Sequence, residues 1–151
     1  MAWSDQLAKL GIELPPVAAP VASYVPAIRS SSLVFTAGQL PLVDGALPAT
    51  GKVGAEIGPD EAQRYARTCA LNALAAVHGL VGIDSVLRVV KAVVFVASAE
   101  GFTGQPAVAN GASELFREIF EDSGQHARSA VGVAELPLGS PVEVELVVEV
   151  S

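Results

Sequence analysis

Residues 86–97 read Val-Leu-Arg-Val-Val-Lys-Ala-Val-Val-Phe-Val-Ala, a nearly continuous apolar run rich in β-branched residues. Strands that are covered on both faces have this composition, so the run predicts a central strand. The last segment, 142–150, alternates instead. One face carries every second residue, all apolar: Val142, Val144, Leu146, Val148 and Val150. The other face is mostly glutamate, which predicts a strand between a core and a polar surface.

Two helices are predicted around the central strand. Pro59 followed by Asp60 and Glu61 is typical of a helix start, because proline suits the first helical position and acidic side chains complement the positive end of the helix dipole. This helix is expected to run to about His78. The second helix is expected over residues 105–121, where apolar residues recur at helical spacing.

Shorter elements are predicted in the rest of the chain. Residues 33–37 and 129–134 are expected to form strands, and residues 42–58, rich in Gly, Pro, Asp and Ala, a long hairpin or loop. The proline-rich residues 15–26 exclude a helix and favour an extended arm or an edge strand. A short helix is expected over residues 4–11, with Ser4 as its N-cap.

The predicted order, β-β-β-α-β-α-β-β, indicates a single α+β domain over residues 1–151. Two helices can cover only one face of its mixed sheet. The strand over residues 86–97 nevertheless looks buried on both faces. We therefore expect the second face to pack against other copies of the chain, for which closed symmetric rings are the common arrangement.

Composition narrows the classes of function. The 151-residue chain is 51% apolar and 17% charged, against about 25% charged in a typical domain, which excludes a disordered chain. Its net charge of −7 argues against nucleic-acid binding, which relies on neutralising phosphates. One cysteine and two histidines without paired spacing predict neither a disulfide nor a metal site. No signal peptide or membrane span is readable, so a soluble cytoplasmic protein is expected.

Arg128 is the strongest candidate for a binding residue. It begins a predicted strand directly after the loop 123–127, where its planar fork of N–H donors would face a loop-lined opening. That geometry suits a small carboxylate, which arginine can hold through two parallel hydrogen bonds. The alternative is a structural ion pair with one of the sixteen acidic residues, and spacing alone favours this alternative.

Four other polar residues each allow two interpretations. Glu143 could transfer a proton or hold a water, or it could belong to a solvated sheet face, which the pattern favours. Tyr24 could close a pocket or pack on an edge strand. Asn110 could orient a ligand, although asparagine more often bonds the backbone. His126 could line the same opening as Arg128 or lie exposed in its loop.

Several short motifs, taken in order, resemble the RidA/YjgF family, also known as endoribonuclease L-PSP. The motifs are Tyr24-Val-Pro-Ala-Ile28, Phe35-Thr-Ala-Gly-Gln-Leu-Pro41, Ala70-Leu-Asn72, Asn110 with Leu115-Phe116, Ala127-Arg128-Ser129, and Val142-Glu143-Val144-Glu145. Each motif is short, and it is their joint order from about Tyr24 to Val150 that makes the resemblance specific.

The resemblance implies a chorismate-mutase-like fold, with a mixed six-stranded sheet and two helices on one face, that forms a homotrimer with clefts between subunits. It also implies hydrolysis of reactive enamines or imines, such as 2-aminoacrylate, to a keto acid and ammonia, without a metal or organic cofactor. In that scheme Arg128 matches the arginine that holds the substrate carboxylate, and Glu143 matches an acid that positions water. Tyr24, Gly38 and Asn110 match pocket positions.

The chain departs from archetypal members of this family at several positions. Ala37 stands where Ser is frequent, Ala130 where Cys is frequent, and Gly132 where Glu is frequent, while residues 1–20 form an N-terminal extension. These differences indicate a divergent branch. Two other functions stay open: a non-catalytic protein that binds a small carboxylate or a protein partner in the same cleft, and a ribonuclease, against which the acidic charge argues.

Overall fold

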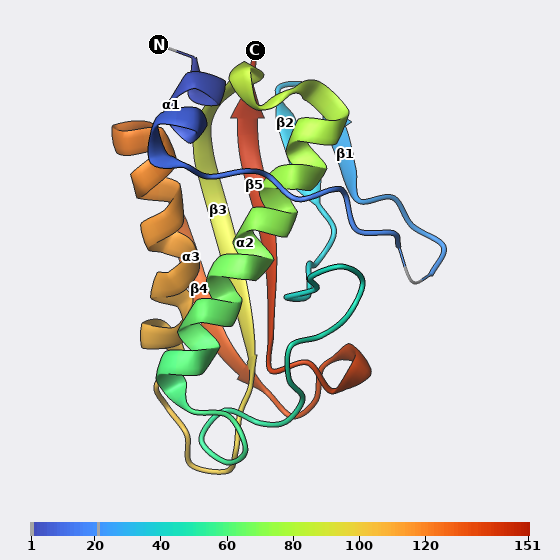
Figure 1. The fold of residues 1–151 in the computed structure, drawn as a ribbon, viewed down its shortest axis with the longest axis vertical. Helices are drawn as coiled ribbons and strands as arrows, with labels where there is room; N and C mark the ends of the chain where they lie inside the picture. The colour runs from blue at the N-terminus through green and yellow to red at the C-terminus, as the bar shows by residue number, and fades with distance from the viewer. Residues whose placement is uncertain (1, 21) are drawn as a thin grey trace.

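The computed structural model of the chain describes residues 2–20 and 22–151 and contains one mixed sheet with helices on one side (Figure 1). The helices are α1 (Trp3–Leu10), α2 (Pro59–Val81) and α3 (Gln105–Phe120). The strands are β1 (Ala27–Ser30), β2 (Leu33–Thr36), β3 (Val86–Ala97), β4 (Ala127–Val133) and β5 (Val142–Val150), in the order β1-β2-β5-β3-β4. The pairing of β3 with β4 is parallel, and the other pairings are antiparallel.

The prediction of six strands is wrong for the described residues, which form five. Of their three α-helices, α2 and α3 are the two predicted around the central strand, and α1 lies where a short helix is expected over residues 4–11. The described residues of the arm, 15–20 and 22–26, add no strand, since the prolines lack the N–H groups that a sheet ladder needs. The loop over residues 42–58 makes only isolated bridges, one of them a tight turn in which Val43 and Ala46 exchange both backbone hydrogen bonds. Asp44 and Gly45 occupy the turn with positive φ angles, as Asp-Gly commonly does.

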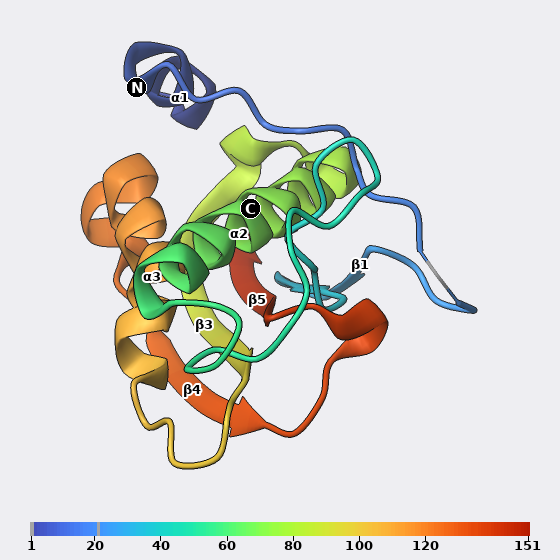
Figure 2. The same cartoon turned by 60° about the horizontal axis from the view of Figure 1, so that its bottom comes forward.

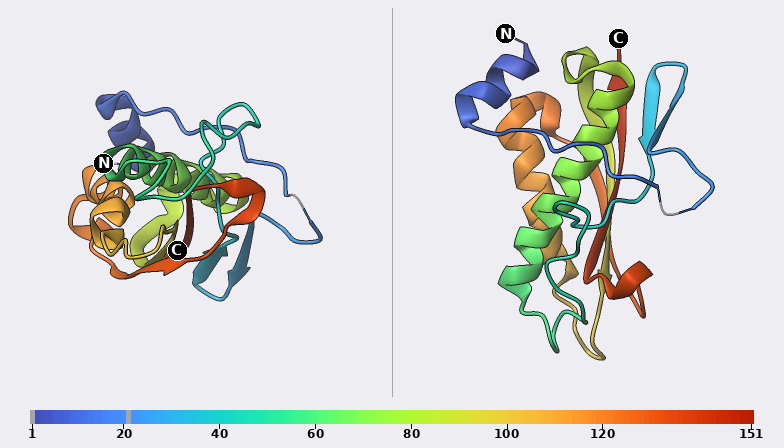
Figure 3. Two further views of the ribbon diagram at one scale, coloured as in Figure 1. Left: turned by 90° about the horizontal axis from the view of Figure 1, so that it is seen from below. Right: turned by 45° about the vertical axis from the view of Figure 1, so that its right-hand side comes forward.

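The core lies between the sheet and the pair α2 and α3 (Figure 3, right). Val89, Ala92, Val94 and Val96 of β3 point into it, as does the apolar face predicted for β5. The two helices approach each other closely at Gly111 of α3, where any side chain would overlap the carbonyl of Gln63 on α2. In the part of the chain that the structure describes, no helix is both long and apolar enough to cross a membrane.

The opposite face of the sheet carries no helix, as the view from below shows (Figure 3, left). Val93 and Phe95 of β3 are only partly covered there. Around them, Ile28 is 59% exposed, Phe35 41% and Val131 41%. Within one chain, therefore, β3 is covered on one face only. The burial of the other face by further copies of the chain stays a prediction.

The N-terminal helix α1 is tied to the start of β3. The Trp3 indole donates a hydrogen bond of 2.7 Å to the Val86 carbonyl, and its ring meets Phe120 of α3 edge-on at 5.3 Å. The backbone N–H and the hydroxyl of Ser4 both donate to the Asp84 carboxylate, at 2.7 and 2.8 Å. These hydrogen bonds lower the pKa of Asp84, because they favour its charged form.

Ser4 is therefore not the N-cap that the sequence suggests. The helix begins one residue earlier, at Trp3, and its capping residue is Ala2, whose side chain makes no capping hydrogen bond. An acceptor distant in sequence, Asp84, satisfies the free N–H of Ser4 in the first turn instead.

We expect Trp3→Ala to lower the free energy of unfolding by about 2 kcal/mol, less than for a fully buried aromatic residue because Trp3 is partly exposed. Trp3 is the only tryptophan, so unfolding in denaturant should be followed by circular dichroism at a fixed protein concentration. Lys9→Ala, on the exposed side of α1, is the matched control. Equal stabilities of the two variants would show that docking of α1 contributes little.

Candidate functional site

Arg128 lies on the helix-covered face of the sheet at its outer strand. It pairs in register with Ala92 of β3, whose side chain is buried beneath the helices, so the side chain of Arg128 also turns toward α3. One guanidinium nitrogen, Nη1, donates to Asn110 Oδ1 at 2.8 Å and to Ser113 Oγ at 3.2 Å. The other, Nη2, donates to the Pro106 carbonyl at 3.4 Å. Three acceptors from α3 thus fix the plane of the guanidinium.

The guanidinium keeps free donors in this arrangement. Of its five N–H groups, one on Nε and one on Nη2 have no acceptor among the described residues. Arg128 also forms no ion pair within the described chain, so the structural ion pair that its spacing suggests is not found there. Two free N–H groups on one guanidinium are what a carboxylate needs for two-point binding.

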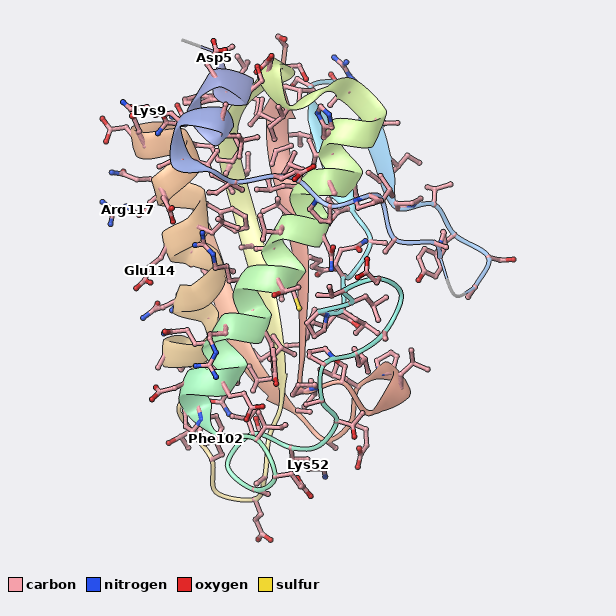
Figure 4. The ribbon with its side chains drawn as sticks, viewed as in Figure 1. Asp5, Lys9, Lys52, Phe102, Glu114 and Arg117 are labelled. Carbon is pink, nitrogen blue, oxygen red and sulfur yellow. The ribbon has the colours of Figure 1, made fainter. Side chains whose placement is uncertain are left out.

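An open cavity of about 270 Å³ lies beside Arg128. It is lined by Ser113, Arg117, Gln125, His126 and Arg128. Arg117 and its neighbour Glu114 point outward from α3, away from the sheet (Figure 4). Two arginines and no acidic residue line the cavity, so it favours an anion despite the net charge of −7.

His126 and Ser113 extend the network around Arg128. His126 Nδ1 lies 2.6 Å from the Gly124 carbonyl, which can only accept, so this nitrogen carries a proton. In the neutral ring, Nε2 then accepts from the Ser113 hydroxyl at 2.8 Å, while Ser113 Oγ accepts from Arg128. Sequence reasoning placed His126 near Arg128 but missed Ser113. The signal was its position three residues after Asn110, on the same side of α3.

A second cluster, formed by Glu143 and Gly38, lies where β5 meets the segment after β2. The Glu143 carboxylate sits against Gly38, where an added Cβ would lie 2.8 Å from Glu143 Cδ and overlap its oxygen. The Gln39–Val144 bridge holds these segments together. Burial raises the pKa of Glu143, and the charge of Glu145 raises it further. Gly38 requires no left-handed backbone here; its role is to leave room for the carboxylate.

Tyr24 joins this second cluster through Gly38. The two residues line one small cavity of about 30 Å³ together with Pro26 and Leu40. Tyr24 itself is exposed, on the segment that leads into β1. Tyr24, Gly38 and Glu143 therefore gather in one region of the chain.

The two clusters lie on opposite faces of the sheet. Arg128 pairs with Ala92 and Ala92 with Leu146, so Arg128 shares the helix-covered face with Leu146. Glu143 is three residues from Leu146 along β5 and therefore points to the other face. Of the predicted site residues, the chain brings Arg128 together with Asn110 and Glu143 together with Gly38, but it does not bring these pairs together.

The structure gives a reason why glycine, and not the glutamate frequent in the family, occupies position 132. A side chain at this position would meet Gln105 Nε2 at 2.8 Å and Ser98 Oγ at 2.9 Å. Gln105 is held there by hydrogen bonds to Ser98 Oγ and the Phe102 carbonyl. The space that a glutamate at position 132 would need is therefore already filled. Across the described ranges 2–20 and 22–151, no three His, Cys, Asp or Glu side chains gather as metal ligands would.

The raised pKa of Glu143 predicts a pH-dependent cost to stability. A carboxyl whose pKa is higher in the folded state contributes most when protonated, so the stability of the folded chain falls as pH rises through its titration range. Glu143→Gln should therefore raise the thermal midpoint at pH 7, with the gain shrinking as the pH falls through the pKa of Glu143. Scanning calorimetry from pH 4 to pH 8 measures it, with Glu149→Gln as the control on the same strand. A gain that does not change with pH would contradict this origin.

Known proteins share much of this sequence. The model of the family described as Endoribonuclease L-PSP matches residues 16–150. Protein TCP17 of Trypanosoma cruzi is 46% identical over 96% of this chain and 92% of its own length. A RutC family protein of Haemophilus influenzae is 33% identical over 85% of this chain and 88% of its own.

Solved structures share the architecture. Atu1372 of Agrobacterium tumefaciens, a protein of unknown function, matches with a TM-score of 0.90 and 39% identity over 99% of this chain and 92% of its own. A protein of Shewanella oneidensis MR-1 reaches a TM-score of 0.94 at 30% identity, over 99% of this chain and all of its own. The YjgF gene product of E. coli matches with a TM-score of 0.66 and 25% identity over 88% of this chain and 92% of its own. The chain belongs to the endoribonuclease L-PSP family, the RidA/YjgF family that its sequence motifs resemble.

Proposed function

We propose that the protein hydrolyses reactive 2-enamino or 2-imino acids, such as 2-aminoacrylate, to a keto acid and ammonia. The observation that carries this proposal is the Arg128 guanidinium, which Asn110, Ser113 and the Pro106 carbonyl hold in place while two of its N–H groups stay free. These two donors would hold the substrate carboxylate. The family membership supports the same assignment.

The reaction needs little more than orientation. An enamine takes up a proton on carbon and releases one from nitrogen to give an imine, and water then adds to the carbon of the C=N bond. The C–N bond breaks as the nitrogen leaves as ammonia, and the oxygen of water becomes the keto oxygen. No electrons are gained or lost. Because the imine is already electrophilic, holding it beside a water molecule supplies much of the rate enhancement.

Glu143 is the proposed partner of that water. Burial raises its pKa toward neutrality, which suits a group that must give and take a proton at one site. Gly38 leaves the carboxylate room against the backbone, and Tyr24 lies in the same region. Any larger residue at position 38 would displace the carboxylate.

The complete site is proposed to lie between subunits. Arg128 and Glu143 point to opposite faces of the sheet, so one chain cannot present both to a single small substrate. A closed ring of three chains would let the Arg128 region of one subunit face the Glu143 region of the next. The exposed apolar side chains of Ile28, Phe35 and Val131 support the association, since water disfavours contiguous apolar surface.

We expect Arg128→Ala to reduce ammonia release from 2-aminoacrylate generated in situ to the spontaneous rate. Arg128→Lys should retain a minor part of the activity, because a point charge replaces a planar fork. Arg64→Ala, an exposed position on α2, is the matched control and should keep full activity. If the natural chain binds pyruvate in an Arg128-dependent way yet releases no ammonia from several 2-imino acids, it is a binding protein rather than a hydrolase.

A mixing experiment tests the site between subunits. Arg128→Ala and Glu143→Gln chains should each be inactive alone. When they are co-expressed in equal amounts, about a quarter of the sites in a ring would combine an intact Arg128 with an intact Glu143 from the next chain. Recovery of about a quarter of the natural activity is therefore expected. No recovery in mixed assemblies, or a mass of one 15.4 kDa chain by light scattering, would contradict a shared site.

A further inference from the structure

A third cavity lies on the helix-covered side of the molecule, away from Arg128. Its walls are the N-terminal arm, which crosses α2 in Figure 1, the tight turn at residues 42–45 and the side of α2 that faces them; Figure 2 shows the arm and α2 from another side. The cavity measures about 550 Å³, a size typical of sites for small molecules. Its apolar lining comprises Pro15, Pro16, Val17, Ala18, Ala19, Leu42, Val43, Leu71 and Leu138.

Asn72 contributes an acceptor to this cavity. Its residue is only 2% exposed, and it lines the cavity wall from α2. Its amide nitrogen donates to the carbonyls of Leu40 and Leu42, at 3.0 and 3.1 Å. Because both of those partners can only accept, the amide orientation is fixed, and Oδ1 points away from them. No donor in the described part of the chain bonds Oδ1, so the cavity wall holds an unused acceptor.

The charged groups of the cavity are also acceptors. Glu13 from the arm and Asp44 from the turn line it, and neither forms an ion pair with a described residue. No Lys, Arg or His lines it. The remaining polar side chain is Thr68, whose hydroxyl donates its hydrogen bond to the Arg64 carbonyl. The side chains therefore offer acceptors and negative charge, and a complementary ligand must bring donors and positive charge.

We propose that this cavity binds a small apolar amine in its ammonium form. The apolar body would pack between the arm and α2 against Leu71 and Val17, while ammonium N–H groups would bond Asn72 Oδ1 and face Glu13 and Asp44. This site differs in chemistry from the cavity beside Arg128, which is lined by two arginines and no acidic residue. It stands independently of the deaminase proposal, since none of its lining residues takes part there.

Three probes of one shape separate charge from apolar burial. Tryptamine, 3-ethylindole and indole-3-propionate share an indole ring and differ in carrying a positive, no or a negative charge at pH 7. We expect tryptamine to bind, 3-ethylindole to bind at least about fivefold more weakly, and indole-3-propionate not to bind at the same concentrations. Calorimetric titration of the natural chain measures the affinities. Equal affinity of the three probes, or no binding of tryptamine at millimolar concentration, would overturn the proposal.

Substitutions then locate the site. Glu13→Gln with Asp44→Asn removes both charges at exposed positions, and asparagine accepts the positive φ of residue 44, so folding should be unaffected. This double variant should bind tryptamine at least about fivefold more weakly. The control, Glu114→Gln with Asp122→Asn, removes two exposed charges on and after α3 and should bind normally. In ¹H–¹⁵N spectra the Asn72 side-chain amide should shift on binding; an unmoved Asn72 signal, or equal weakening in both double variants, would refute this location.

Discussion

The parallel pairing of β4 with β3 determines where the polar groups of the candidate site can lie. It places Arg128 opposite Ala92, and thereby on the covered face of the sheet at its outer edge. From there the guanidinium reaches the acceptors of α3, which a side chain on the other face could not do. The antiparallel pairing of β5 with β3 sends Glu143 to the opposite face. The strict alternation of side chains along strands thus separates the two halves of the site within one chain.

The long elements could be predicted from sequence because their patterns are repeated many times. The bounds Val86–Ala97 and Val142–Val150 were predicted as observed, and both long helices begin at the predicted residues, Pro59 and Gln105. The strand count could not be predicted, since the described residues of the proline-rich segment 15–26 and the isolated bridges in residues 42–58 do not join a ladder. Ser4 was misassigned because its partner, Asp84, is 80 residues away, and single-sequence patterns do not record such contacts.

Only part of the candidate site has a signal in the sequence. Arg128 was identified from its position after a loop, and Asn110 was also a candidate. That the two residues meet could not be predicted, because the acceptors that orient Arg128 come from another element, α3. The resemblance supplied Glu143, Gly38 and Tyr24, and the structure adds a physical reason for Gly38, which is the space taken by the carboxylate. The N-terminal segment is shared with Atu1372 and the Shewanella protein, each of which matches 99% of this chain, whereas the match to YjgF covers 88%.

The hydrogen bonds of Trp3 and Ser151 hold the two ends of this sequence close to each other. Trp3 bonds the carbonyl of Val86, and the backbone N–H of the last residue, Ser151, bonds that of Ser85 at 2.9 Å, so consecutive residues hold both ends at one pole of the molecule (Figure 1). Trp3 and Ser151 therefore lie close together. A short covalent linker could join its ends without disturbing the sheet, and new ends could then be opened in an exposed loop. The same packing should therefore form when the segments follow one another in a different order along the chain.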